Sequence, residues 1–295
     1  MINDPTRRSF LATSTLATLA AGTRSSHAAE SLFHISLAQW TINRELKAGE
    51  IDHLDFAKVA SDHGYEALEY VNQFFMDKAR DETYLAEMKK RAEDHGVKSL
   101  LIMCDNEGKI GDPDEAKRTE AVENHHKWID AARVLGCHSI RVNAYSSGSK
   151  EEQLKLVTDG LSRLTDYGAE QEINVLVENH GGYSSDGDWV VSLMQAVDHE
   201  RCGTLPDFGN FRISEGESYD SYLGVEQLMP WAKGVSVKDQ VWDANYNRAD
   251  LDYDRMLRLV LDTGFRGFCG VEHGGFAGLN ASREALEQVR TRLAR

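Results

Sequence analysis

The chain has 295 residues, with 48 acidic against 33 basic side chains and a formal net charge of −15. A hydrophobic fraction of 41% beside 27% charged residues is ordinary for a globular protein and excludes an intrinsically disordered chain. The acidic excess argues against nucleic acid or an anionic membrane surface as a partner, because phosphates bind clustered lysines and arginines. The cysteines form no CxxC pair and are predicted to be buried thiols rather than disulfides or zinc ligands: Cys104, Cys137, Cys202 and Cys269.

The first 28 residues have the layout of an export signal. Arg7 and Arg8 lie in the run T-R-R-S-F-L, an Ala- and Leu-rich stretch follows, and small residues come at Ser26 and Ala28. This order predicts a twin-arginine signal peptide at 1–28 and a mature protein in the periplasm or beyond. The apolar run is too short to span a bilayer core of about 30 Å, so no membrane span is expected.

Residues 29–295 repeat one unit eight times: a short apolar run, a polar turn and an amphipathic stretch. The apolar runs are predicted strands at 33–40, 67–71, 98–104, 139–144, 174–178, 204–207, 234–238 and 267–272. The amphipathic stretches, with apolar residues three and four apart, are predicted helices at 52–63, 82–95, 114–135, 150–170, 188–199, 221–231, 252–263 and 281–293. No Pro- or Ser-rich break is long enough to be a linker. The pattern predicts an α/β fold with one domain, a closed (β/α)8 TIM barrel.

Three predicted strands end in a carboxylate. Glu178 ends the fifth strand, Asp207 the sixth and Glu272 the eighth. Chemistry in such barrels sits at the carboxyl ends of the strands, so these groups are expected to converge at one mouth. Converging carboxylates repel one another unless a cation lies among them, whereas a single one would be better explained as a solvated loop residue. An oxygen-rich site of this kind favours a hard divalent ion such as Mn²⁺ or Mg²⁺.

The same residues suit proton transfer next to a carbonyl group. Isomerising or epimerising a sugar needs an acid, a base and a cation that stabilises the enediolate oxygens. Glu178 and Glu272 are the candidate acid and base, and Asp207 is mainly a ligand. Lys238 shares a strand face with Ser236. Two interpretations of Lys238 stay open: it contacts the substrate, by polarising a carbonyl or holding a carboxylate, or it forms a salt bridge to Asp207 or Glu272.

Other polar or aromatic side chains near strand ends are candidates for substrate contacts, although each alone could equally be structural. Arg141 and Asn143 share a strand face and suit recognition of hydroxyl or carboxylate groups. The full set is Trp40, Glu69, Asp105, Glu107, Arg141, Asn143, Asn179, His180, Asn210 and His273.

Four runs resemble the xylose-isomerase-like sugar isomerase/epimerase superfamily, and more narrowly an exported bacterial branch of it: VENHGGYSSD, GTLPDFGNF, GVSVKD and GFCGVEHGG. The resemblance covers essentially all of the mature chain. It implies a metal held by Glu, Asp, His and Glu at the ends of strands five to eight. By motif Glu178, Asp207 and Glu272 match three of these ligands, and the two glutamates match the acid and base. Ser236 stands where the family's H-x-K-D pattern has its histidine. This leaves the fourth ligand to water, His180, His273 or substrate, or implies a weakly bound metal.

The resemblance and the residues together favour a metal-dependent isomerase or epimerase of a free sugar or keto-sugar, with Mn, Mg, Zn or Co as the ion. Lys238 matches the lysine of the dehydratase-like pattern, so a lyase that eliminates water or an aglycone from a keto-sugar is one alternative. A non-catalytic sugar-binding barrel without metal is the other. Barrels of this group often pair, and a homodimer is left open because nothing in the sequence marks an interface.

Overall fold

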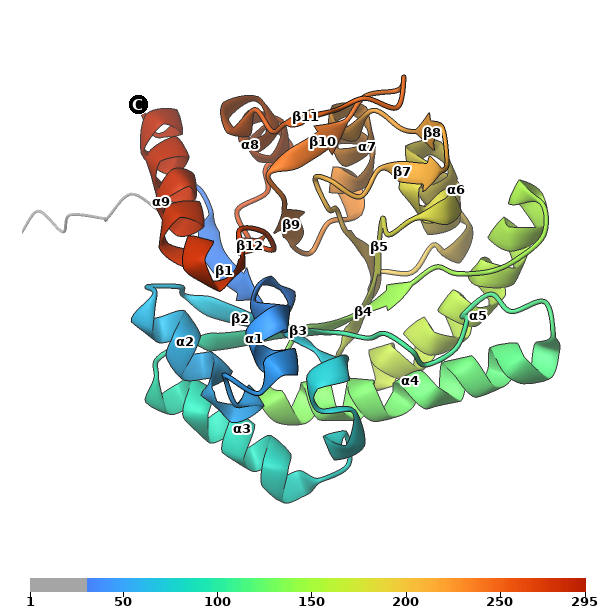
Figure 1. Ribbon diagram of the computed structural model, residues 1–295. Helices are drawn as coiled ribbons and strands as arrows, with labels where there is room; N and C mark the ends of the chain where they lie inside the picture. Colours follow the sequence, from blue (N-terminus) through green and yellow to red (C-terminus); the bar gives the residue numbers. More distant parts are fainter. Residues whose placement is uncertain (1–30) are drawn as a thin grey trace, which may run out of the picture. The chain divides into compact units, whose positions relative to one another are not determined.

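The computed structural model describes residues 31–295, and the predicted signal peptide therefore lies outside the described residues. Eight parallel strands form one sheet in the order β6-β5-β4-β3-β2-β1-β12-β9 (Figure 1). Parallel bridges at Thr204–Ala232 and Asp207–Ser236 join the two edge strands, so the sheet closes on itself. The predicted (β/α)8 barrel is confirmed. Its strands are β1 His34–Ala38, β2 Ala67–Val71, β3 Lys98–Met103, β4 Ser139–Asn143, β5 Asn174–Glu178, β6 Cys202–Leu205, β9 Val235–Val237 and β12 Phe268–Val271.

Helices follow the strands around the outside of the barrel (Figure 1). They are α1 Asn43–Ala48, α2 Phe56–Asp62, α3 Glu82–Asp94, α4 Glu115–Leu135, α5 Lys150–Glu170, α6 Gly187–Val197, α7 Ser221–Leu228, α8 Tyr253–Asp262 and α9 Gly275–Leu293. Most begin at a polar N-cap whose side chain accepts a backbone N–H, as Asp114 does for α4, and Ser149 with Glu152 forms a capping box for α5. The six-residue α1 was not predicted, and α9 begins six residues before the predicted start at 281.

Two short antiparallel hairpins extend the loops after the sixth and seventh barrel strands. The first pairs β7 (Arg212–Ser214) with β8 (Glu217–Ser218), and the second pairs β10 (Gln240–Trp242) with β11 (Arg248–Asp250). These strands were not predicted, because strands of two or three residues carry too few alternations to show a period.

The hydrophobic core has two parts. The larger one fills the space between strands and helices and includes Trp128, Trp189 and Phe208. The smaller one lies inside the barrel and consists of Ala38, Ala67, Val71, Leu100, Leu101, Met103, Leu176 and Leu205. All four cysteines are buried thiols without a disulfide in the described part of the chain, as predicted. Among the helices of residues 31–295, none is both long and apolar enough to cross a membrane.

Candidate active site

The three carboxylates at the strand ends come together. Parallel pairing aligns the carboxyl ends of neighbouring strands, so Glu178, Asp207 and Glu272 reach the same mouth of the barrel. One oxygen from each carboxylate lies within 4.8 Å of the other two. Glu178 and Asp207 are 1% and 0% exposed. We call these three residues the carboxylate triad.

Backbone contacts hold Asp207 in place. Its Oδ1 accepts hydrogen bonds from the N–H groups of Gly209 at 2.7 Å and Asn210 at 2.8 Å. The side chain of Asn179 bonds both the N–H and the carbonyl of Asp207, each at 2.8 Å, and so ties the loop after β6 to the end of β5. Asn179 and the backbone of Asn210 therefore position a triad member, and Oδ2 of Asp207 is left facing the triad.

Lys238 forms the salt bridges that were one of its two predicted roles. Its Nζ lies 2.7 Å from Oε1 of Glu272 and 3.1 Å from Oδ2 of Asp207. Ser236 donates a hydrogen bond to Oε2 of Glu272 at 2.8 Å. Burial by itself raises the pKa of Glu272, but Lys238 and the Ser236 hydroxyl outweigh it and hold the pKa below its usual value. Burial lowers the pKa of Lys238, but the attraction of Asp207 and Glu272 outweighs burial. The net result is a pKa above the usual value for lysine.

Glu178 and Asp207 are less well compensated than Glu272. Within residues 31–295, neither oxygen of Glu178 accepts a hydrogen bond, and Oδ2 of Asp207 accepts none either. The cation nearest Glu178 is Arg141, whose Nε lies 2.7 Å from Oε2. Burial raises the pKa of both carboxyls to about 7, against the opposing attraction of Arg141 for Glu178 and of Lys238 for Asp207. Buried carboxylate oxygens without hydrogen bonds fit a hard divalent cation, which takes oxygen ligands.

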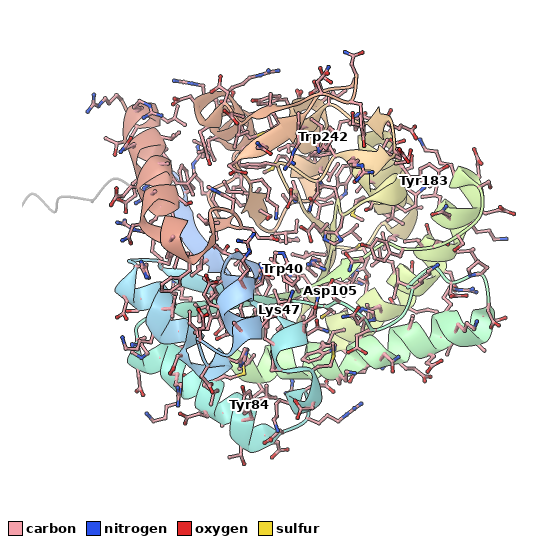
Figure 2. All side chains as sticks on the ribbon, viewed as in Figure 1. Trp40, Lys47, Tyr84, Asp105, Tyr183 and Trp242 are labelled. Atoms are coloured by element: carbon pink, nitrogen blue, oxygen red, sulfur yellow. The ribbon has the colours of Figure 1, made fainter. Side chains whose placement is uncertain are left out.

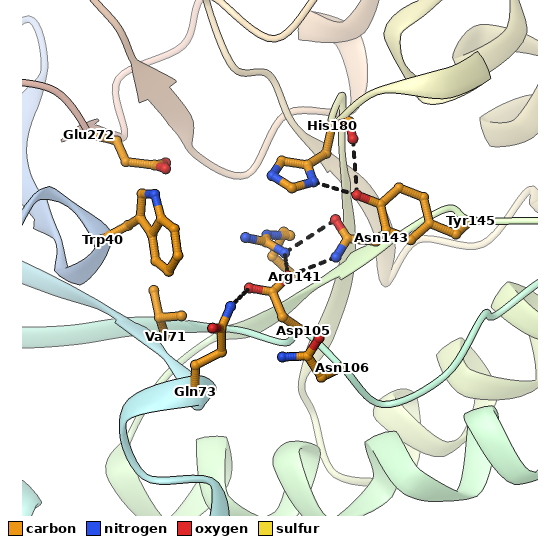
Figure 3. A pocket seen from close by; sticks show the side chains of 10 residues that line it. All are labelled: Trp40, Val71, Gln73, Asp105, Asn106, Arg141, Asn143, Tyr145, His180 and Glu272. Atoms are coloured by element: carbon orange, nitrogen blue, oxygen red, sulfur yellow. Dashed lines mark hydrogen bonds and ion pairs between the residues drawn. The ribbon is translucent and has the colours of Figure 1, made fainter. Parts of the chain in front are cut away.

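Arg141 also bonds a second carboxylate, Asp105, which lies just after β3. Its guanidinium is 2.9 Å from Oδ1 of Asp105, and Asn143 and Gln73 donate to the same carboxylate at 2.8 and 2.9 Å (Figure 3). Burial alone would raise the pKa of Asp105, but Arg141 and these hydrogen bonds lower it to about 2. The predicted Arg141–Asn143 pair thus forms one network with Asp105 and Gln73.

A cavity of about 280 Å³ opens at the mouth of the barrel, and Glu272 is the triad member that lines it. Its lining includes five predicted substrate contacts together with Glu272 (Figure 3): Trp40, Asp105, Arg141, Asn143 and His180. The predicted contact His273 lines a neighbouring pocket that shares Trp40 and Glu272 with the first. Trp40 borders both pockets, and Lys47 lies against it, with Nζ 4.2 Å from the centre of its ring (Figure 2).

Two other candidates lie elsewhere. Glu69 is buried inside the barrel rather than at the mouth, where its Oε1 accepts a hydrogen bond from Ser36 at 2.6 Å. A Cβ on Gly270 would lie only 2.4 Å from that carboxylate, so the glycine makes room for it. Glu107 accepts a hydrogen bond from the indole of Trp128 at 2.6 Å and pairs with Lys127, which gives it a structural setting.

Three polar residues that line the cavity were not predicted: Gln73, Asn106 and Tyr145. Gln73 and Tyr145 each come two residues after the end of a barrel strand, and this spacing was the available signal. The Tyr145 hydroxyl lies 2.7 Å from Nδ1 of His180, and burial together with Arg141 lowers the pKa of His180. These loop residues add hydrogen-bonding groups on the side of the cavity away from Glu272.

Known proteins agree with this architecture. The family model of the xylose isomerase-like TIM barrel matches residues 57–292, and the chain belongs to that family. No protein of curated function matches the chain in sequence. Its fold is similar to D-psicose 3-epimerase with D-tagatose from Clostridium cellulolyticum H10, at 11% identity and a TM-score of 0.69, over 88% of this chain and 99% of that one.

Two further solved structures share the fold. One is the 3-keto-D-glucoside 4-epimerase from E. coli, at 16% identity and a TM-score of 0.67, over 88% of this chain and 99% of that one. The other is a xylose isomerase-like TIM barrel protein from Mycobacterium smegmatis in complex with magnesium. It is 18% identical, with a TM-score of 0.64, over 88% of this chain and 97% of that one. At such identities these likenesses show the fold.

Proposed function

We propose that the protein is a metal-dependent isomerase or epimerase of a free sugar or keto-sugar. The observation that carries this proposal is the carboxylate triad, whose oxygens converge within 4.8 Å and whose member Glu272 lines a polar cavity. Glu178, Asp207 and Glu272 would hold the divalent ion, whose oxygen-rich donor set suits Mn²⁺ or Mg²⁺. When bound, such an ion stabilises the negative charge that develops on a substrate oxygen beside the reacting carbon.

Glu178 and Glu272 are the proposed proton carriers. They come from β5 and from the end of β12, which are three positions apart around the closed barrel, so they approach a substrate from different directions. Their surroundings also differ: Lys238 and Ser236 keep Glu272 ionised, whereas burial raises the pKa of Glu178 to about 7. A pair with separated pKa values suits one group that accepts a proton and one that returns it.

The remaining lining residues would bind and orient the sugar. Trp40 offers an aromatic face, and Asn143, Tyr145 and His180 offer donors and acceptors to hydroxyl groups (Figure 3). A cavity of about 280 Å³ is close to the lower end of the size range for small-molecule sites, roughly 300–1,000 Å³. Two proteins of similar fold, a psicose epimerase and a keto-glucoside epimerase, bear names that agree with this substrate class.

Proton exchange in D₂O tests this function directly. The purified protein would be incubated with Mn²⁺ and a set of ketohexoses and keto-glucosides, and the products followed by NMR. An epimerase or isomerase places deuterium on the carbon whose configuration or oxidation level changes. Loss of water or an aglycone without an isomer would instead support a lyase, and failure of every sugar to react would contradict the proposal.

The Glu272→Gln variant assigns that activity to this site. It removes one proton carrier and one ligand charge while keeping the shape of the side chain, so we expect turnover to fall by about a thousandfold. Glu45→Gln is the matched control, because Glu45 lines the neighbouring pocket but is outside the triad. Elemental analysis adds a second readout: about one metal ion in the wild type, lost in the Glu178→Ala, Asp207→Ala double variant. Full activity in Glu272→Gln would contradict its role.

A further inference from the structure

The ammonium group of Lys238 contacts the one oxygen of Asp207 and the one oxygen of Glu272 that no other group bonds. Oδ1 of Asp207 is taken by the backbone of Gly209 and Asn210, so Oδ2 is the oxygen that remains for a cation. Oε2 of Glu272 is taken by Ser236, which leaves Oε1. Lys238 Nζ lies 3.1 Å from the first of these remaining oxygens and 2.7 Å from the second.

A divalent ion held by the triad needs the same two oxygens. The ion and the ammonium are both cations, so they repel each other at the short distance that shared ligands impose. The site also excludes most solvent, since Asp207 is 0% exposed, and screening there is weak. Simultaneous contact of the ammonium and the ion with Asp207 and Glu272 is therefore strongly disfavoured.

We propose that Lys238 is the resident cation of the triad in the metal-free protein, and that a divalent ion binds by displacing its ammonium group. This inference rests on the metal site of the proposed function. The lysine is suited to the exchange because its four-carbon stem is flexible, and its side chain keeps 18% exposure to solvent. Gly209 leaves the stem unobstructed, since a Cβ there would lie 3.0 Å from Cβ and Cγ of Lys238.

The arrangement has two consequences. Metal binding is opposed by the loss of two ion pairs, so the affinity is lower than three converging carboxylates would otherwise give. In the metal-free protein, Lys238 partly neutralises charges that would otherwise be buried together, so it stabilises that state. The displaced ammonium is then available to a substrate, which is the other role that the sequence left open for Lys238.

Affinity for Mn²⁺ tests the exchange without any assay of turnover. Dissociation constants would be measured by competition with a fluorescent chelator for the wild type, Lys238→Met and Lys47→Met. We expect Lys238→Met to bind Mn²⁺ at least about tenfold more tightly, because the competing cation is gone. Lys47→Met removes one positive charge beside Trp40 but none from the triad, and should bind within about twofold of the wild type.

Thermal unfolding gives the second readout. Lys238→Met should melt at a lower temperature than the wild type in chelator, and Mn²⁺ should raise its melting temperature by more than it raises that of the wild type. If Lys238→Met does not fold, Lys238→Gln takes its place in both measurements. Equal or weaker Mn²⁺ binding in these variants, or no binding to any form, would overturn the inference.

The outcome separates this inference from the proposed function. Tighter Mn²⁺ binding by Lys238→Met, in a protein that exchanges no proton with any sugar, would support the displacement and contradict the isomerase. Sugar turnover by the wild type with unchanged Mn²⁺ affinity in Lys238→Met would support the isomerase and contradict the displacement.

Discussion

Asp105 and Glu178 contact the same guanidinium group, yet their pKa values move in opposite directions. Asp105 lies 2.9 Å from Arg141 and its pKa falls to about 2, whereas Glu178 lies 2.7 Å from Arg141 and its pKa rises to about 7. The distance to the cation therefore does not explain the difference.

The difference comes from the other neighbours. Asp105 also accepts hydrogen bonds from Gln73 and Asn143 and its side chain keeps 16% exposure. Glu178 is almost fully buried, accepts no hydrogen bond within the described residues, and is repelled by Glu272. On the Asp105 side of Arg141, protein groups satisfy the carboxylate, and we call this the completed side. On the Glu178 side, the carboxylate oxygens accept no hydrogen bond within the described residues, and we call this the incomplete side. Buried oxygens without partners are typical of a site that binds a ligand.

Glu69 should show the largest effect, because its carboxyl is buried inside the barrel. Burial raises its pKa to about 8, so the folded protein keeps its proton while the unfolded chain loses it near pH 4.5. A raised pKa contributes stability that is lost as the pH rises, here between about 4.5 and 8. Glu69→Gln cannot ionise, so its stability relative to the wild type should increase by roughly 4 kcal/mol from pH 5 to pH 8.

Chemical denaturation in chelator at pH 5, 6.5 and 8 measures this trend. The comparison of variant with wild type at each pH cancels the titration of the other groups. A stability difference between variant and wild type that does not change with pH would show that the Glu69 carboxyl titrates normally. Raised carboxyl pKa values would then be confined to the triad.

Replacing each carboxylate beside Arg141 tests the comparison itself. The lowered pKa of Asp105 means that its ionised form stabilises the fold at neutral pH, so Asp105→Asn should lower the free energy of unfolding by about 2 kcal/mol. The raised pKa of Glu178 means that its ionised form destabilises the fold at neutral pH. Glu178→Gln should therefore leave the stability of the metal-free protein unchanged or increase it. Urea unfolding at pH 7 in chelator measures both. Equal losses would mean that the two sides of Arg141 do not differ.

The sequence predicted the barrel because its signals are local and repeated. Eight apolar runs alternate with amphipathic stretches, and six of the eight predicted strands end within one residue of the observed end. The exceptions are the first strand, predicted to reach residue 40 although β1 ends at Ala38, and the sixth, predicted to include Asp207 although β6 ends at Leu205. The six-residue α1 and the two hairpins are too short to show a period.

The sequence predicted those site residues whose polar side chains stand at or near the end of a predicted strand. Glu178, Asp207 and Glu272 follow that rule, and the structure brings them together. The network around Asp105 joins loop and strand residues from three separate units, and nothing in their spacing shows which side chains meet. Glu69 was expected at the mouth, but it precedes the end of β2 by two residues, and this places its carboxyl inside the barrel.

Ser236→His gives the smallest expected effect and tests whether the Glu178 side lacks a ligand. Ser236 is paired with Asp207 across the closure of the barrel and bonds Glu272, so it borders the triad. The sequence resemblance implies a metal-binding histidine at this position. An imidazole there would offer a nitrogen ligand that Mn²⁺ and Zn²⁺ accept, and Mn²⁺ affinity should increase by about tenfold.

Asn143→His is the matched control, because it puts the same side chain into the completed network of Asp105. It should leave Mn²⁺ affinity unchanged and lower the melting temperature, since Asp105 loses a hydrogen bond. Tighter binding in both variants would mean that any added imidazole near the mouth captures metal, and tighter binding in neither would mean that Ser236 does not border the ion. Only an increase confined to Ser236→His agrees with one completed and one incomplete side of Arg141.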